Sequence, residues 1–157
     1  MKSDIAFRSL RGAILFLGLT AGFNTFADEL DDLVKEACTG LSVRFSSGAT
    51  KSDPIDDDIA QAIDSNAELK ALVARARFTG SARACGGDTK AGEIRLDASA
   101  ATFFPGSAAK TKRLVQILHC TEARTAREAG SHWNSQQFCA QAQRSFDTYV
   151  THNQPPP

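Results

Sequence analysis

The sequence predicts an all-α fold: a small disulfide-linked helical domain of about five helices, with a C-terminal antiparallel helical hairpin and one irregular, glycine-rich excursion. Three observations support it. Apolar residues recur every three or four positions in several segments, helix-start signals precede most of these segments, and the chain holds an even number of cysteines, four.

Residues 1–27 are predicted to be a cleavable secretory signal peptide. A basic start with Lys2, Arg8 and Arg11 precedes an apolar run, residues 13–23, that is too short to cross a hydrocarbon core of about 30 Å. Thr25-Phe26-Ala27 then fits a small-x-small cleavage site. The alternative is a buried N-terminal helix of a cytosolic protein. We expect a periplasmic or secreted product, cleaved near Ala27, with no membrane span in the mature chain.

Composition limits the classes of partner. Without residues 1–27, 130 residues remain, the size of one domain, with 15 basic and 17 acidic side chains. This near-neutral balance argues against nucleic acid or an anionic membrane as the main partner, because both require a basic excess. The charge is nevertheless divided: residues 28–65 carry a net −7 and residues 66–157 a net +5. We expect the two parts to attract each other; the alternative is a dipolar surface that steers a charged partner.

Residues 28–41 form the first predicted helix of the mature domain. Acidic residues crowd its first turn, where the helix dipole favours them, and Gly40 is a plausible stop. Its apolar side chains are spaced to lie on one face: Leu30, Leu33, Val34, Ala37, Cys38 and Leu41.

Two more helices follow a polar connection. Ser52-Asp53-Pro54 reads as the start of the second helix, with an N-cap and proline in the first turn. Ser65 and Glu68 form a capping-box pattern, which predicts a third helix that ends at about Phe78.

Residues 79–106 are predicted to be the irregular excursion. Glycines interrupt this stretch, and the alternation of polar and apolar residues over 93–97 predicts a short strand or extended segment. A loop of this length is uncommon in a compact domain, and Cys85 offers a tether for it.

The last two predicted helices, residues 107–127 and 131–150, are joined by a short turn and should form the antiparallel hairpin. Cys120 and Cys139 lie symmetrically about this turn, so we expect them to pair, which leaves Cys38 to pair with Cys85. This is the favoured one of three possible connectivities. The domain is expected to span residues 28–152, followed by a disordered proline-rich tail, residues 153–157.

No motif predicts a catalytic residue, a cofactor or a metal ion. The cysteines lack C-x-x-C spacing, the acidic run at 56–58 lacks the calcium-loop pattern, and the segment 85–93 lacks the G-K-[ST] ending of a phosphate loop. His119 neighbours Cys120, but adjacent helical residues point in different directions and we expect Cys120 to be oxidised. His132, Glu122 and Glu128 are expected to be surface residues.

We therefore expect an exported binding or inhibitor protein that acts by protein–protein contact and is not an enzyme. In size, export and disulfide-held helices it resembles small immunity proteins that neutralise cell-wall-degrading toxins, which implies a protein partner such as a co-encoded secreted enzyme. The sequence does not give the oligomeric state. The candidate partner-binding residues are Asp56, Asp57, Asp58, Asp88, Lys90, Glu93 and Arg95.

Two other functions remain open. The first is an acid-responsive, chaperone-like helical protein of the periplasm, because protonation of the acids in residues 28–65 would release their attraction to the basic part. The second is a small hydrolase that uses His119 or His132 together with an acid.

Overall fold

The computed structural model describes residues 21–41, 53–132 and 134–157, and within them it is all-helical, as predicted, with no strand. The predicted signal peptide lies mostly outside the described residues, and the expected cleavage position after Ala27 falls inside the first helix. No helix in the described ranges is long and apolar enough to cross a membrane. The helices are α1 (Ala21–Cys38), α2 (Pro54–Ser65), α3 (Ala67–Ala84), α4 (Lys90–Ala100), α5 (Ala108–Ala129) and α6 (Gln136–Ser145).

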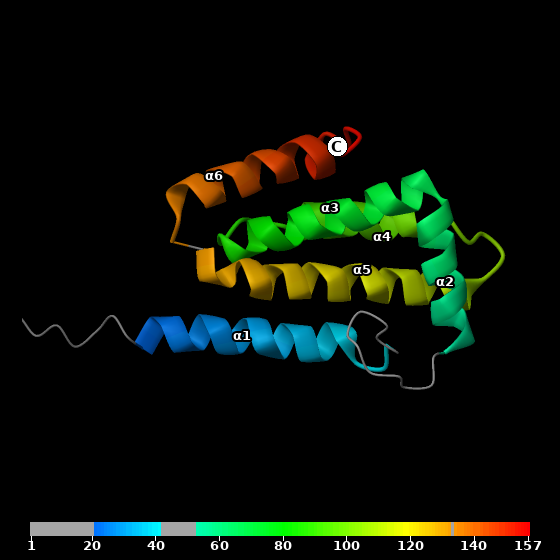
Figure 1. The fold of residues 1–157 in the computed structure, drawn as a ribbon, viewed down its shortest axis with the longest axis horizontal. Helices are drawn as coiled ribbons and strands as arrows, with labels where there is room; N and C mark the ends of the chain where they lie inside the picture. Colours follow the sequence, from blue (N-terminus) through cyan, green and yellow to red (C-terminus); the bar gives the residue numbers. More distant parts are fainter. Residues whose placement is uncertain (1–20, 42–52, 133) are drawn as a thin grey trace, which may run out of the picture.

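The long helices lie side by side in the order α1, α5, α3, α6, and α2 runs across one end (Figure 1). A short 3₁₀ turn, Gly130–His132, follows α5, and a π-helical turn, Phe146–Thr151, extends α6. The main core lies where α2, α3, α4 and α5 meet. Its fully buried side chains include Ile59, Leu72, Leu114 and Leu118.

Several helix boundaries follow the predicted capping chemistry. Asp53 caps α2, because its Oδ1 accepts a hydrogen bond from the Ile55 amide at 2.9 Å, and Pro54 occupies the first turn. Ser107 caps α5 by accepting from the Lys110 amide at 3.3 Å. Gly40 follows α1 with φ +73°, the left-handed conformation in which glycine ends a helix.

The first predicted helix, residues 28–41, begins earlier than expected, because α1 spans Ala21–Cys38 and has no acidic residue in its first turn. Two other predicted helix starts are wrong by a few residues. The cap of α3 is Asn66, whose Oδ1 accepts from the Glu68 and Leu69 amides, while Ser65 ends α2. The start expected at Ser131 falls in the 3₁₀ turn, and α6 is capped by Ser135 instead. In both places another cap-forming side chain lies within a few residues of the predicted one.

The predicted strand over residues 93–97 is wrong, because this stretch belongs to α4. Three positions spaced four apart, Gly92, Leu96 and Ala100, form the buried face of α4. At Gly92 an added Cβ would lie 2.6 Å from the Phe146 ring, so the missing side chain lets α4 pack closely against the π-helical turn. Helical packing at this spacing prevails over the local alternation of polar and apolar residues.

The predicted end of α3 at about Phe78 is also wrong. Gly80 does not break the helix; it lies where α3 crosses α5, and an added Cβ would be 2.3 Å from the backbone oxygen of Glu122. The helix ends at Ala84 in a Schellman motif: Gly86, at φ +74°, donates its amide to Arg83 O, and Gly87 donates to Ala82 O. The predicted excursion, residues 79–106, therefore consists of the end of α3, a short turn, α4 and a second short connection before α5.

The structure contradicts the favoured disulfide pairing. Cys38 pairs with Cys120, with a Cα–Cα distance of 4.8 Å, and Cys85 pairs with Cys139 at 5.5 Å. Helices α5 and α6 do run antiparallel, but α6 packs on α3, which lies between them (Figure 1). Cys139 therefore faces the end of α3 rather than Cys120.

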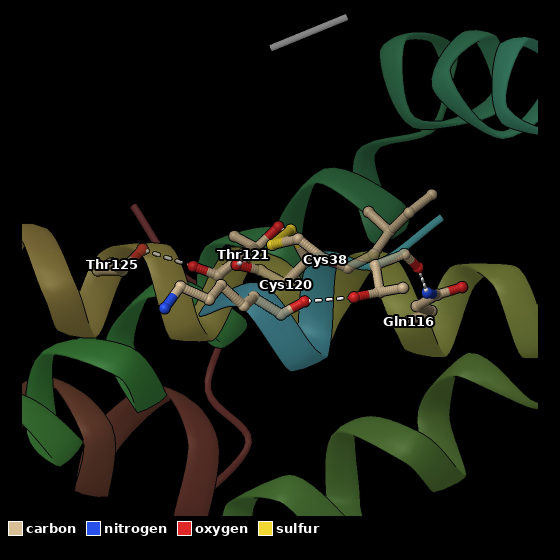
Figure 2. Close-up of a disulfide and its surroundings, with 8 residues drawn as sticks. Cys38, Gln116, Cys120, Thr121 and Thr125 are labelled. Carbon is tan, nitrogen blue, oxygen red and sulfur yellow. Dashed lines mark hydrogen bonds between the residues drawn. A yellow bond between two sulfur atoms is a disulfide. The ribbon is translucent and has the colours of Figure 1, made fainter. Parts of the chain in front are cut away.

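Helix α1 packs on α5 and is held there at several points. The Cys38–Cys120 disulfide joins the two helices next to Gln116, whose Nε2 donates to Thr39 O at 2.6 Å (Figure 2). Leu30 is buried close to Gly130, and Asp31 forms an ion pair with Arg127 at 2.5 Å. One side of α1 is thus fixed to α5, and its other acidic residues, Asp28, Glu29, Asp32 and Glu36, line a cleft.

Ion pairs connect the acidic segment, residues 28–65, to the basic remainder of the chain. All four ion pairs between residues 28–65 and the rest of the described chain pair an aspartate of α1, α2 or the α2 cap with a cation of α5. Arg113 is the cation that contacts two of these aspartates, since it binds both oxygens of Asp56 and approaches Asp53 to 3.8 Å. The expected attraction between the two parts is confirmed.

Candidate functional site

An open cleft of about 1070 Å³ lies between residues 26–36 of α1 and the turn from α3 to α4, with the start of α4. Its lining includes six carboxylates and only two cations, Arg83 and Lys90, so its formal charge is −4. Apolar atoms of Leu30 and Leu33 also contribute. A concave wall of one charge sign focuses the electrostatic potential and attracts groups of the opposite sign. The carboxylates are Asp28, Glu29, Asp32, Glu36, Asp88 and Glu93.

The turn between α3 and α4 sets one wall of this cleft. The Schellman motif reverses the chain after Cys85, and the Asp88 side chain then accepts from the Lys90 amide at 3.2 Å, at the start of α4. The disulfide from Cys85 to Cys139 fastens the same turn to α6. These constraints bring Asp88, Lys90 and Glu93 to the cleft on a fixed backbone.

Glu93 and Arg83 form a bonded pair at this wall. Arg83 Nη2 lies 2.5 Å from Glu93 Oε1, and Thr89 Oγ1 donates to the same oxygen at 2.6 Å. Burial alone would raise the pKa of Glu93, but the hydrogen bonds from Thr89 and Arg83 outweigh it and hold the pKa below its usual value. Glu93 is therefore a fixed anion at neutral pH.

Glu122 lies behind Arg83 and is 1% exposed, so the expectation that it is a surface residue is wrong. Arg83 Nη2 approaches Glu122 Oε1 to 2.8 Å. The contact is an ion pair only, because neither oxygen of Glu122 accepts a hydrogen bond from the described residues. Burial raises the pKa of Glu122 to about 7, and the opposing charge of Arg83 offsets this only in part.

The position of Glu122 in the helix explains its burial. It follows Leu118 and precedes Ala126 by four residues each, so it lies on the buried stripe of α5. Gly80 lets α3 approach α5 at this point, and the carboxylate is enclosed between the two helices. Sequence reasoning missed Glu122 because it treated a polar residue as exposed, although the stripe was visible in the spacing.

The structure separates the candidate partner-binding residues into two groups. Asp88, Lys90 and Glu93 line the cleft, whereas Arg95 lies exposed on α4 outside that lining. The run at 56–58 lies far from it on α2, where Asp56 is buried against Arg113 and Asp58 forms an ion pair with Lys110 at 2.8 Å. Asp57 is half-buried beside them. The acidic cleft residues of α1 were not among the candidates.

The histidines lie in different surroundings. His119 Nε2 is 2.9 Å from Asp97 Oδ1, so this imidazole has a carboxylate partner that the sequence did not predict. In the described part of the chain no hydroxyl or thiol is hydrogen-bonded to it, and all four cysteines form disulfides. His132 is exposed, as expected, with its ring 5.3 Å from that of Phe138. The described residues contain no group of three potential ligands placed to hold a metal ion.

Comparison with protein-family models, curated proteins and solved structures finds no match for this chain. Its function must therefore be inferred from its own residues.

Proposed function

We propose that this chain is an exported, periplasmic binding protein of the inhibitor type, which receives a basic segment of a partner protein in the acidic cleft. The observation that carries the proposal is the lining of the cleft, with six carboxylates against two cations. Four of these carboxylates project from α1 and are exposed. The cleft is therefore complementary to lysine and arginine side chains, and such complementarity favours fast and selective association.

The framework around the cleft is suited to binding. The two disulfides fix α1 to α5 and the α3–α4 turn to α6, so both walls of the cleft are fastened before a partner arrives. A preformed surface loses little conformational entropy on association. In the finer form of the proposal, the partner is a co-encoded secreted enzyme that degrades cell walls, and this chain is its immunity protein.

The proposal is tested by capture from an envelope extract of the source organism with the tagged, exported chain. We expect one stoichiometric partner, identified by mass spectrometry, whose cell-wall hydrolysis the chain suppresses. The double variant Glu29→Lys/Glu36→Lys reverses two cleft charges and should lose the partner. Asp64→Lys/Glu68→Lys makes the same charge change at exposed positions outside the acidic cleft and should retain it. Absence of a stoichiometric partner would contradict the proposal.

The ion pairs between α5 and the acidic helices favour a second candidate, the acid-responsive chaperone. Protonation of Asp53, Asp56 and Asp58 at low pH would remove the charges that hold α2 on α5. Release of α2 would expose Ile59 and its apolar core partners, which a chaperone could offer to an unfolded client. Client aggregation measured at about pH 3 and at neutral pH distinguishes this function. Equal aggregation with and without the protein at acid pH would exclude it.

The pair of His119 and Asp97 is the observation relevant to a hydrolase. A histidine oriented by a carboxylate is a usable general base. Alanine replacement of both His119 and His132 tests this function. If the variant retains all biological activity, the hydrolase alternative is excluded.

A further inference from the structure

Two carboxylates share one nitrogen of Arg83 at the wall of the cleft. Nη2 of Arg83 lies 2.5 Å from Glu93 Oε1 and 2.8 Å from Glu122 Oε1. The two acids differ in their surroundings, because Glu93 also accepts from Thr89, whereas the buried oxygens of Glu122 accept no hydrogen bond from the described residues. Arg83 is thus the only charge that compensates Glu122 within bonding distance in the described chain.

The charge of this three-residue cluster depends on one proton. With both acids ionised, the cluster of Arg83, Glu93 and Glu122 carries −1; with Glu122 protonated, it is neutral. The other charged groups that face Glu122 come from α4, where Glu93 and Asp97 raise its pKa, and His119 of α5 lies near Glu93. Burial brings the titration of Glu122 close to neutral pH.

We propose that Glu122 is a proton-controlled switch of the acidic cleft. When Glu122 is ionised, it draws the Arg83 guanidinium inward, so part of the Glu93 charge stays uncompensated. When Glu122 is protonated, Arg83 pairs with Glu93 alone, and the affinity of the cleft for cations falls. That the cleft binds a cationic partner rests on the proposed function, whereas the movement of Arg83 between the two carboxylates does not depend on it. By linkage, binding of a basic segment should release a proton from Glu122 near neutral pH.

The first measurement follows Arg83 in the free protein. The Nε–Hε resonance of Arg83 should shift in one step centred near pH 7, and the step should be absent in Glu122→Gln. His119→Asn is the matched control, because it removes the ionisable side chain that lies near Glu93, and asparagine still offers Asp97 a hydrogen bond. It should keep the step.

The second measurement uses a nona-arginine peptide as the basic probe. We expect the peptide to bind about tenfold more tightly at pH 8 than at pH 6, as a change of one nearby charge allows. Glu122→Gln should remove the part of this pH dependence that Glu122 contributes. A chain cleaved after Ala27 begins at Asp28, at the cleft, and its α-amino group also titrates near neutral pH. Glu122→Gln leaves that group intact, so the variant separates the two contributions.

If Glu122→Gln does not fold, Glu93→Gln serves instead. The Arg83 signal should still shift in this variant, but at a lower pH than in the wild type, because the Glu93 charge that raises the pKa of Glu122 is removed. An Arg83 signal that does not shift between about pH 5.5 and pH 8.5 overturns the switch, whether or not the peptide binds. A shifting signal without peptide binding at either pH supports the switch and contradicts the proposed function.

Discussion

At Glu122, packing and charge oppose each other: the residue lies on the buried face of its helix, yet its side chain can ionise. Its place on the buried stripe of α5 removes it from water, and a single guanidinium compensates it. A buried carboxyl group without hydrogen bonds favours its neutral form, which is why its pKa rises to about 7.

This raised pKa predicts how the stability depends on pH. A carboxyl group whose pKa is higher in the folded than in the unfolded state stabilises the fold at low pH and loses this contribution as pH rises between the two values. For Glu122 the window runs from its ordinary value of 4.5 to about 7. Over this window the free energy of unfolding of the wild type, relative to Glu122→Gln, should fall by roughly 3 kcal/mol. Urea titrations of both proteins at several pH values measure it; a constant difference would contradict the burial of Glu122.

Gly80 makes the α3–α5 crossing possible, so its replacement should be costly. A Cβ at this position would lie 2.3 Å from Glu122 O and 2.9 Å from Thr125 Cβ, and the helices must separate to admit it. Gly80→Ala should therefore destabilise the fold by about 2 kcal/mol or more, despite the better helix propensity of alanine. Gly106→Ala is the control, because no atom lies within 4 Å of the added Cβ. Equal stabilities of the two variants would show that the close crossing is absent.

At the level of elements, α2 is held on α5 by charge as well as by apolar packing. Arg113 binds Asp56 through both carboxylate oxygens, and both side chains are largely buried. Arg113→Gln removes the compensating cation from Asp56 and should cost about 3 kcal/mol. Lys35→Gln breaks the Asp32–Lys35 pair, whose side chains are 77% and 76% exposed, and should leave the stability nearly unchanged. Chemical denaturation of the two variants checks the contrast, and a small effect of Arg113→Gln would contradict it.

The disulfides define which elements are fastened to each other. Peptide mapping without reduction should recover Cys38 with Cys120 and Cys85 with Cys139. Because Cys38–Cys120 spans 82 residues, Cys38→Ser/Cys120→Ser should lose about 4 kcal/mol and show faster amide exchange in α1. Cys85→Ser/Cys139→Ser should leave α1 protected. Recovery of Cys38 with Cys85 would contradict the arrangement of the helices.

The sequence predicted the local features of each helix better than it predicted which helices pack against each other. The all-α fold, the Asp53 and Ser107 caps and the stop at Gly40 follow from chemistry within a few residues. The disulfide pairing failed because it required α5 and α6 to be packed neighbours, and no local pattern shows that α3 lies between them. Helix α4 failed for a similar reason, since the packing of Gly92 against Phe146 is a long-range contact.

At the scale of the whole molecule, the candidate site was only partly predictable. Asp88, Lys90 and Glu93 were chosen from the irregular stretch, and they do line the cleft. The α1 carboxylates were read only as favourable charges at a helix start, because the sequence does not show which helix faces the α3–α4 turn. Arg83 and Glu122 are brought together by the α3–α5 crossing, which depends on Gly80.

The charge division of the chain serves two separate purposes in this fold. Part of the acidic segment binds α5 and stabilises the molecule, through Asp31, Asp53, Asp56 and Asp58. Another part, Asp28, Glu29, Asp32 and Glu36, faces the cleft. The near-neutral total charge of the chain therefore conceals a strongly acidic concave surface.

The central claim, that the acidic cleft binds a basic partner, is tested most directly by calorimetric titration of the captured partner into three proteins. These are the wild type, Glu29→Lys/Glu36→Lys and Asp64→Lys/Glu68→Lys. We predict that the cleft variant binds about 100-fold more weakly than the wild type, because like charges then face each other, while the control variant binds within about threefold. Equal affinity of the cleft variant and the wild type would contradict the claim.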